Sequence, residues 1–537
     1  MDRLPEEIIA MIITHLAADP PNHHHHGNPG AAPPRTTGLA AYAAVSRRWQ
    51  PRIEALTFAH ITLTPARLAS PLAARALTPD RVRRLVRSIY LDVLLPPYDE
   101  AARRRVEDDA ERAANDAVFT DAVRRLFALL AAAGAGEDYR PKIHLSLAAR
   151  CESDMEDWEG RHRRRPVSPT APRDLFERRY ESSYLDLRLA TPGQSAEGEA
   201  EALPEVHCIL GFGVQRIDSP LLHYRHFAPR ALCLMASRMS GLEQVYWVLR
   251  DKEKRDVELR KKLRADFADS LQALPPTLRS FHLLYGGPAP KDHFFERPSI
   301  LDEADPDDHD KLSLALHKLS QRLFEFHLTA DVGPEIFWPS GSAELDDQQP
   351  QHGENAGDSP SPPYWPNMMY YGINPGAISP SGRWRFRRRT DSFGDDSDHV
   401  VESDVSDSSD VAPGDEIHRA FREEVDPDAV RPLLLAAARA AGRMPALRHM
   451  SFVIGSPPTN AGWLRVSYTT APSSRRSARL GGGDAPRLVV GGRPLSHLDL
   501  EKEVVEAWEE AARKHSDAEL RCALVTKRLF DRYWAAP

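Results

Sequence analysis

Residues 278–283 read Leu-Arg-Ser-Phe-His-Leu, and residues 323–328 read Leu-Phe-Glu-Phe-His-Leu. In both stretches an apolar residue is followed three positions later by a second one, and two positions after that by a third. The last two apolar residues stand on either side of a histidine, which is the alternation of a strand with one buried face. Each stretch therefore predicts a short strand.

The same spacing recurs along the chain after residue 80. Further copies are Val86, Ile89 and Leu91; Leu242, Val245 and Trp247; and Leu447, Met450 and Phe452, with a shorter variant at 143–147. Segments with a helical pattern precede several copies, at 119–130, 267–274, 312–323 and 433–441. This repetition of helix and strand predicts an α/β fold, with parallel strands on one side and helices on the other.

The repeating unit resembles an irregular leucine-rich repeat, in which a helix alternates with a strand of the x-x-Leu-x-Leu type. The intervals between copies are unequal, and the signature asparagine is absent. A generic α/β domain with buried strands is therefore the alternative. Under either interpretation, the α/β region offers a broad surface suited to holding another protein.

The N-terminal segment has a different, helical pattern. Residues 4–9 read Leu-Pro-Glu-Glu-Ile-Ile, so that Pro5 can occupy a first helical turn and two acidic residues follow at the positive end of the helix dipole. An apolar stripe then continues through Ile8, Ile9, Ile12, Ile13 and Leu16. A second apolar-periodic segment runs from 39 to 49, and a short helix through Ile53 and Leu56 follows. These patterns predict a small module of three helices.

Two stretches of this module resemble the F-box. They are Leu-Pro-Glu-Glu-Ile-Ile at 4–9 and Ala-Val-Ser-Arg-Arg-Trp at 44–49, which are similar to the Leu-Pro-x-Glu-Ile start and the Val-Ser-Arg-x-Trp end of that family. In style the whole chain is similar to F-box-like proteins of filamentous fungi. F-box modules bind a Skp-type adaptor, which in turn binds a cullin. The resemblance implies adaptor contacts from Leu4, Pro5, Ile8, Ile9, Ile12 and Val45, with Trp49 packing nearby.

The F-box-like module is expected to span residues 1–68, with an insert at 19–38 that is longer than the usual connection. Since a longer loop adds only about 0.6 kcal/mol per doubling of its length, the insert weakens the resemblance without excluding it. The alternative is an ordinary helical cap on the following domain.

The remaining boundaries follow from composition. The α/β domain is expected at 80–339, with a disordered insert at about 152–174, and again at 416–537, where a helical stripe around Trp508 closes the core. Residues 340–415 are poor in aliphatic side chains and rich in Gly, Pro, Ser and Asp, which predicts a disordered insertion. Within it, the aromatic cluster at 360–386 is expected to pack onto the core. The acidic stretch 391–416 is interpreted as a solvated loop, with phosphorylation of its serines as the alternative.

Composition excludes several classes of protein. The net charge of −8 argues against a general nucleic-acid binder, although the basic-aromatic run 383–389 resembles a single-strand contact or a nuclear-import signal. The cysteines, Cys151, Cys208, Cys233 and Cys522, form no C-x-x-C pair, which excludes a zinc framework or a disulfide scaffold and fits a reducing compartment. A charged N-terminus and the lack of a long apolar run predict a soluble protein of the cytosol or nucleus, without a membrane contact.

The sequence contains no catalytic signature. Motifs of the HExxH, Walker A and GxSxG types are absent. The histidines at 23–26 lack the spacing of a designed metal site, while His144, His282 and His327 are interpreted as structural strand residues. No catalytic residue, cofactor or metal is expected. The sequence thus predicts a substrate-recruiting subunit of a ubiquitin ligase. The alternatives are a non-ligase scaffold and an enzyme whose site is assembled from scattered residues.

Overall fold

The computed structural model describes most of the helices and strands of the chain. The described residues are 5–17, 42–43, 46–103, 105–134, 142–154, 179–189, 202–214, 224–251, 253–287, 289–301, 309–339, 362–388, 413–414, 419, 421–455, 463–470, 485–493 and 502–525. The chain divides into two compact units. Unit 1 comprises Met1–Val248 and Ala273–Leu278, and unit 2 comprises Leu249–Gln272 and Arg279–Pro537.

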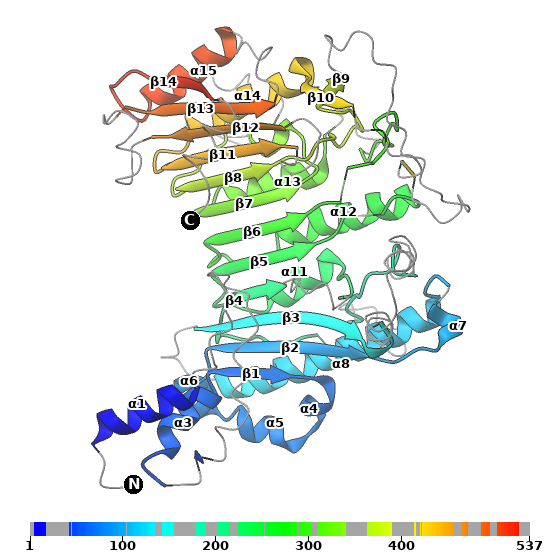
Figure 1. Cartoon of the computed structure of the whole chain (residues 1–537), viewed down its shortest axis with the longest axis vertical. Coiled ribbons are helices and arrows are strands. Elements are labelled where there is room, and N and C mark those ends of the chain that lie inside the picture. The colour runs from blue at the N-terminus through cyan, green and yellow to red at the C-terminus, as the bar shows by residue number, and fades with distance from the viewer. Residues whose placement is uncertain are drawn as a thin grey trace, which may run out of the picture. The chain divides into compact units, whose positions relative to one another are not determined.

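Unit 1 combines a parallel sheet with helices (Figure 1). Its strands are β1 (His60–Leu63), β2 (Ser88–Leu95), β3 (Ile143–Cys151), β4 (Ile209–Val214) and β5 (Gln244–Leu249). Its helices are α1 (Glu6–Ala17), α3 (Gln50–Thr57), α4 (Pro65–Ala69), α5 (Pro71–Ala76), α6 (Pro79–Arg84), α7 (Glu100–Arg103), α8 (Asp109–Gly134) and α11 (Pro229–Ser237), with a 3-10 turn η1 (Glu152–Asp154).

The strands of unit 1 lie in the order of the chain, and each pairs in parallel with the next. Every second residue of β2, beginning with Ile89, is buried. In Figure 1, α8 and α11 lie on one side of these strands. Parallel neighbours joined by helical crossovers explain why one face of each strand is continuously apolar.

Unit 2 carries the longer run of strands. They are β6 (Ser280–Tyr285), β7 (Glu325–Ala330), β8 (Tyr370–Asn374), β9 (Phe386–Arg388), β10 (Arg422–Val425), β11 (His449–Ile454), β12 (Trp463–Thr469), β13 (Arg487–Arg493) and β14 (Arg521–Val525). The helices are α12 (Val257–Leu271), α13 (Lys311–Ser320), α14 (Pro427–Ala441) and α15 (Lys502–Arg513), with a 3-10 turn η2 (Pro334–Ile336).

The main sheet of unit 2 is parallel at one end and mixed at the other. Strands β6, β7, β8 and β11 pair in parallel in that order, β12 and β13 are antiparallel to their predecessors, and β14 returns parallel to β13. Strands β9 and β10 form a separate antiparallel ribbon. Together, the two units confirm the mixed α/β class with a mostly parallel sheet.

Helix starts in unit 2 are fixed by acidic caps. The carboxylate of Asp256 accepts a hydrogen bond from the Leu259 amide at 2.9 Å, and that of Asp310 accepts from the Ser313 amide at 3.0 Å. Asp426 caps α14 in the same way. A carboxylate at this position satisfies an amide that has no partner within the helix and opposes the helix dipole. Each of these caps sets where a crossover helix begins.

The structure corrects the expectation that residues 340–415 form one disordered insertion. Within that range β8 lies between β7 and β11, and Trp365, Met368 and Tyr371 are buried. A five-residue strand with a glycine at its centre changes the composition of a long polar segment very little. The composition of 340–415 therefore could not predict β8. Residues 340–361 and 389–412, which include most of the acidic stretch, lie outside the described residues.

Other expected insertions also fall mostly outside the described residues. That is true of 19–38 and of 155–174, whereas residues 152–154 form η1. In the N-terminal module, α1 and α3 are described, but the segment 39–49 is described only at 42–43 and 46–49. The three-helix module therefore stays a prediction.

The described part of 416–537 contains both strands and helices. Helix α15 buries Val504 and Trp508, as the stripe in the sequence indicates, and residues 521–525 form β14. Among the described residues, no helix has the length and apolar character required to cross a membrane.

Candidate functional site: the exposed face of helix α1

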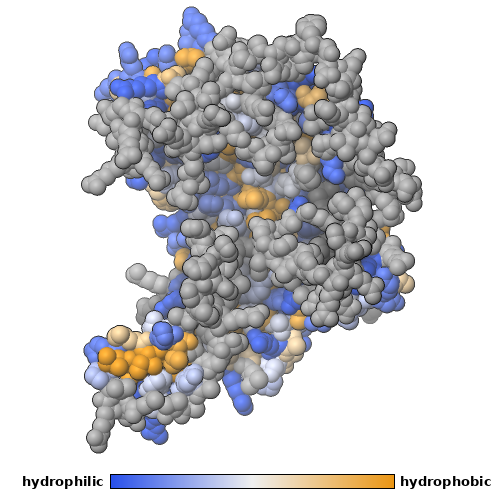
Figure 2. Space-filling view, in the orientation of Figure 1, coloured by the Kyte–Doolittle hydropathy of each residue, from blue (hydrophilic) through white to orange (hydrophobic). Residues whose placement is uncertain are grey.

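The apolar side chains of helix α1 differ in how far they are buried. Ile9 and Ile13 point into a small core with Trp49 and Ile53, where all four side chains are buried. On the same helix, Ile8, Met11 and Leu16 are 40%, 67% and 42% exposed. We call these three residues the α1 apolar face. Figure 2 shows a hydrophobic patch where Figure 1 places α1.

The two stretches that resemble the F-box contact one another. Trp49, from the second stretch, packs with Ile9 of the first. Arg52 Nη2 donates a hydrogen bond to Glu6 Oε2 at 2.7 Å, and Arg48 Nη2 donates to Glu6 Oε1 at 3.3 Å. These hydrogen bonds, Arg52 first and Arg48 second, lower the pKa of the Glu6 carboxyl. The pairs are exposed and add little stability, but they fix the position of α1 along α3.

The helical pair is tied to the α/β part of unit 1 through helix α6. Arg81 Nη2 lies 3.7 Å from Glu54 Oε1, and the guanidinium carbon of Arg81 lies 4.3 Å from the centroid of the Phe58 ring. Strand β1 begins two residues after Phe58. The α1 apolar face is therefore presented by a helix pair whose second member runs directly into the sheet.

The structure distributes the expected adaptor-binding residues among three environments. Pro5 and Ile8 are exposed, and Ile12 is half-buried against the small core. Leu4 and Val45 lie outside the described residues. Ile9 and Trp49 are buried.

The burial of Ile9 corrects the expectation that it contacts the adaptor. It is fully buried, so it can support the contact surface but cannot form part of it. An isoleucine on either side of an amphipathic stripe looks the same in the sequence, and the side on which α3 packs decides which one stays exposed.

Met11 was missed as a site residue. It is the most exposed member of the α1 apolar face, and it lies three positions after Ile8, where helical geometry places two side chains side by side. This spacing was available in the sequence and could have identified it. Leu16 was included in the helical stripe but not among the expected contacts.

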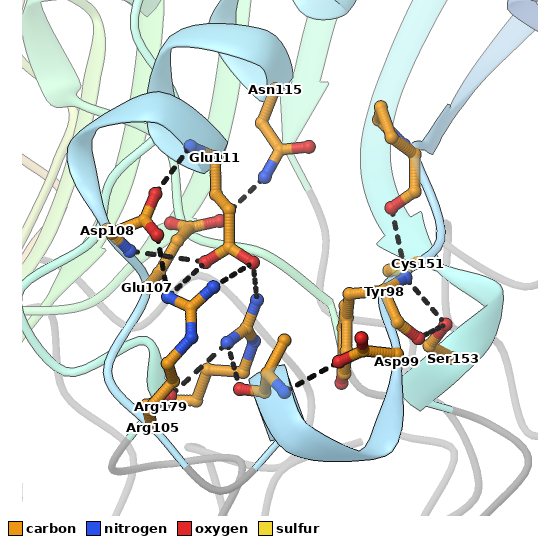
Figure 3. A network of polar contacts seen from close by, with 12 residues as sticks. Tyr98, Asp99, Arg105, Glu107, Asp108, Glu111, Asn115, Cys151, Ser153 and Arg179 are labelled. Carbon is orange, nitrogen blue, oxygen red and sulfur yellow. Dashed lines mark hydrogen bonds and ion pairs between the residues drawn. The ribbon is translucent and has the colours of Figure 1, made fainter.

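A buried polar network elsewhere in unit 1 has a structural role. Arg225 donates two hydrogen bonds to Glu107, at 2.9 and 2.8 Å, and the Asn115 amide donates a third at 2.6 Å. Figure 3 shows the Glu107–Asn115 contact beside the pairing of Glu111 with Arg105 and Arg179 at the start of α8. These charges meet partners of opposite sign, so the network fastens α8 to neighbouring segments.

One group in the same part of unit 1 is unusual. Burial raises the pKa of Asp154 to about 6, against the opposing effect of hydrogen bonds from Tyr98 and Tyr180 and of the nearby Arg225. The tyrosine hydroxyls donate to one carboxylate oxygen of Asp154, at 3.3 Å for Tyr180. These hydrogen bonds hold the Asp154 side chain inside the fold, in the turn that follows β3.

A cluster of buried charges in unit 2 is likewise satisfied internally. Arg260 binds Asp251 at 2.7 Å and Asp331 at 3.0 Å, and Arg264 binds Asp251 at 2.9 Å. Burial alone would raise the pKa of Asp251, but the two arginines outweigh it and lower that pKa to about 2. The adjacent pocket, lined by Arg260 and Arg297, has a volume of about 20 Å³, which is room for roughly one water molecule.

Comparison with known proteins bears on the C-terminal part of the chain. A family of unknown function, DUF6546, matches residues 418–533. The matched stretch includes β10 to β14 with α14 and α15, so the chain is similar to that family over one end of unit 2. No curated protein matches the chain, and no solved structure matches it.

Proposed function

We propose that this chain is the substrate-recruiting subunit of a ubiquitin ligase of the Skp, cullin and F-box type. In this proposal the N-terminal helices bind a Skp-type adaptor, which connects the chain to a cullin, and the α/β units hold a protein target. The chain itself supplies no catalytic residue. It acts by proximity, because a bound target presents its lysines to a ubiquitin-charged enzyme at high effective concentration.

The observation that supports the proposal is the exposure of the α1 apolar face. A helix that only capped the following domain would bury its apolar surface, whereas α1 buries Ile9 and Ile13 and leaves Ile8 and Met11 open to solvent. Contiguous exposed apolar side chains of this kind mark protein-binding surfaces. Ile8 lies in the F-box-like stretch 4–9 and Met11 follows that stretch closely, which favours a Skp-type adaptor as the occupant.

The target-binding part rests on exposed side chains of the strands. In unit 1, Tyr246 is exposed between the buried neighbours Val245 and Trp247 on β5. In unit 2, Leu284 of β6 is exposed between buried neighbours, and Tyr370 is exposed at the start of β8. Exposed aromatic residues are enriched at protein interfaces, so these positions support a broad protein-binding face on each unit.

A binding experiment with the full-length chain tests the adaptor contact. The chain is mixed with a purified Skp-type adaptor, and the dissociation constant is measured by calorimetry for the wild type and for the double variant Ile8→Asp with Met11→Asp. Burial of each side chain in an interface contributes about 1.5–3 kcal/mol, so the double variant should lose at least about 100-fold in affinity.

The matched control is Leu234→Asp, which replaces a similarly exposed leucine on α11 of unit 1. It should leave adaptor affinity unchanged. If the wild-type chain does not bind the adaptor, the ligase proposal is wrong and the scaffold alternative takes its place. If the wild type binds and the α1 double variant binds equally well, the adaptor contact lies elsewhere on the chain.

A further inference from the structure

The helix-free face of the sheet in unit 2 brings two histidines and a glutamate together. Strands β6 and β7 pair in parallel, with His282 opposite His327 and Ser280 opposite Glu325. The intervening residues of both strands are buried, so alternation directs these four side chains to the opposite, part-exposed face.

The three ionisable side chains converge on one point. His282 Nε2 lies 3.4 Å from Glu325 Oε1, and His327 Nε2 lies 3.2 Å from the same oxygen. The two imidazole rings are 4.5 Å apart between centroids. One nitrogen of each imidazole and one carboxylate oxygen lie within 4.8 Å of one another.

These separations match those between the ligands of a single small cation. Four ligands at about 2.0–2.1 Å from a tetrahedral zinc ion lie about 3.3 Å apart. The two nitrogen–oxygen distances already have this value. The two imidazole nitrogens lie within 4.8 Å of each other.

Two neighbouring residues, Ser280 and Gly372, position the side chains of Glu325 and His327. The Ser280 hydroxyl donates a hydrogen bond to the other carboxylate oxygen of Glu325, Oε2, at 3.2 Å. On β8, Gly372 lies opposite His327, and a Cβ atom at that glycine would lie only 2.5 Å from His327 Nδ1. The missing side chain therefore provides the space in which the His327 ring lies, with its Nε2 turned toward Glu325. Such supporting contacts are typical of metal sites.

We propose that His282, Glu325 and His327 form a binding site for a divalent transition metal ion of the zinc class. Two imidazoles and one carboxylate are a ligand set that zinc and its neighbours in the first transition row accept. Magnesium and calcium prefer a shell made only of oxygen ligands, so they fit this set poorly. Because the three side chains are partly exposed, water or a side chain of a bound molecule could occupy the remaining coordination positions of the metal ion.

The Glu325 carboxylate pairs with both imidazoles in the structure, and a metal ion would replace those contacts with coordination bonds. The site requires neither the adaptor contact nor a protein target, so it stands or falls independently of the proposed function.

Unit 1 contains a natural control for the site. His144 of β3 lies opposite Gly211 of β4, and a Cβ atom at Gly211 would lie 2.3 Å from His144 Nδ1. Across the other edge of β3, His144 lies opposite Ser88. His144 and Gly211 thus resemble His327 and Gly372, but the residues paired with His144 include neither a second histidine nor a carboxylate. Among the described residues, only His282, Glu325 and His327 form such a donor group.

Metal titration of the full chain tests the site, provided that the histidine run at 23–26 is removed first. That run could bind metal by itself, so all measurements use a background in which His23, His24, His25 and His26 are replaced by Ala. Cobalt(II) is titrated into this background, and its visible absorption reports the number and type of ligands. Zinc(II) is then added in competition, with magnesium and calcium at millimolar concentration as negative arms.

The background protein should bind one cobalt ion that zinc displaces and that magnesium and calcium do not. His282→Ala, Glu325→Gln and His327→Ala should each weaken binding about 100-fold or more, whereas His144→Ala should have no effect.

A second pair of variants tests positioning without removing a donor. Gly372→Ala should weaken cobalt binding about 10-fold by displacing the His327 ring, whereas Gly211→Ala should leave it unchanged. Circular dichroism confirms that each variant is folded. The proposal is overturned if the background protein binds no cobalt, or if binding persists unchanged in the folded His327→Ala and Glu325→Gln variants.

Discussion

Replacing Glu107 by Leu leaves the guanidinium of Arg225 buried in unit 1 without its anion. In the native protein the two side chains share two hydrogen bonds of 2.9 and 2.8 Å, and both are almost completely inaccessible to solvent. Removing one member of a buried ion pair destabilises a protein by about 3–5 kcal/mol, because the remaining charge is neither solvated nor paired.

The double variant Glu107→Leu with Arg225→Met should be less damaged than Glu107→Leu alone. It leaves no charge in the interior, and replacement of both partners by apolar side chains of similar size is often close to neutral. The Asn115 amide and the buried Ser183 hydroxyl both donate to Glu107 and would still lose their acceptor, as they do in Glu107→Leu alone. A buried donor without a partner costs about 1–3 kcal/mol, so the double variant should still be destabilised, but by less than Glu107→Leu, which carries the unpaired guanidinium as well.

Hydrogen exchange measured by mass spectrometry gives the appropriate readout, because two compact units need not unfold together. A loss of 3 kcal/mol should accelerate amide exchange in peptides of α8 by about a hundredfold. Peptides of α15, in unit 2, provide the internal reference. Exchange of α8 at the wild-type rate in Glu107→Leu would refute the reasoning, as would a double variant less stable than Glu107→Leu.

Three further outcomes are expected. Ile9→Ala should destabilise the α1–α3 pair by about 2–5 kcal/mol and Ile8→Ala by less than about 0.5 kcal/mol, as measured by hydrogen exchange of α1 peptides. Unit 2 should lose stability between pH 6.5 and pH 4: burial lowers the pKa of His317 to about 4, so the unfolded chain binds a proton that the native chain excludes. The contribution of His317 to this loss is about 3 kcal/mol, and denaturant titrations should show a flatter pH dependence for His317→Gln. Trp508→Ala removes a fully buried ring that lies 5.1 Å from Tyr468 and should cost about 3–5 kcal/mol in thermal unfolding.

The regular strands were predictable from sequence because their alternation is local. In β6 and β7 a part-exposed residue follows each buried one, so the period appears within six residues. Strand β8 is different. Its residues 370–374 include a glycine, and its stability comes from β7 and β11 on either side, which are separated from it in the chain. The pairing of β8 with β7 and β11 is a tertiary contact, so the residues 370–374 alone do not predict it.

The candidate sites show the same division. The apolar character of α1 was evident, but the choice between Ile8 and Ile9 as the exposed residue depends on where α3 packs. The convergence of His282 with Glu325 depends on the register between β6 and β7, and these residues are 43 positions apart in the chain. Without that register, the two histidines were interpreted as ordinary strand residues.

Strand β14 is the last strand in the sheet order of unit 2 and lies beside β13. It forms the parallel ladder that covers one edge of β13, whose residues Leu488, Val489 and Val490 are buried and strongly apolar. Chains shortened before residue 521 would leave the backbone amides and carbonyls of that edge available to pair with another molecule. Shortened forms of this protein should therefore self-associate through β13, and a soluble fragment of unit 2 needs to extend through residue 525.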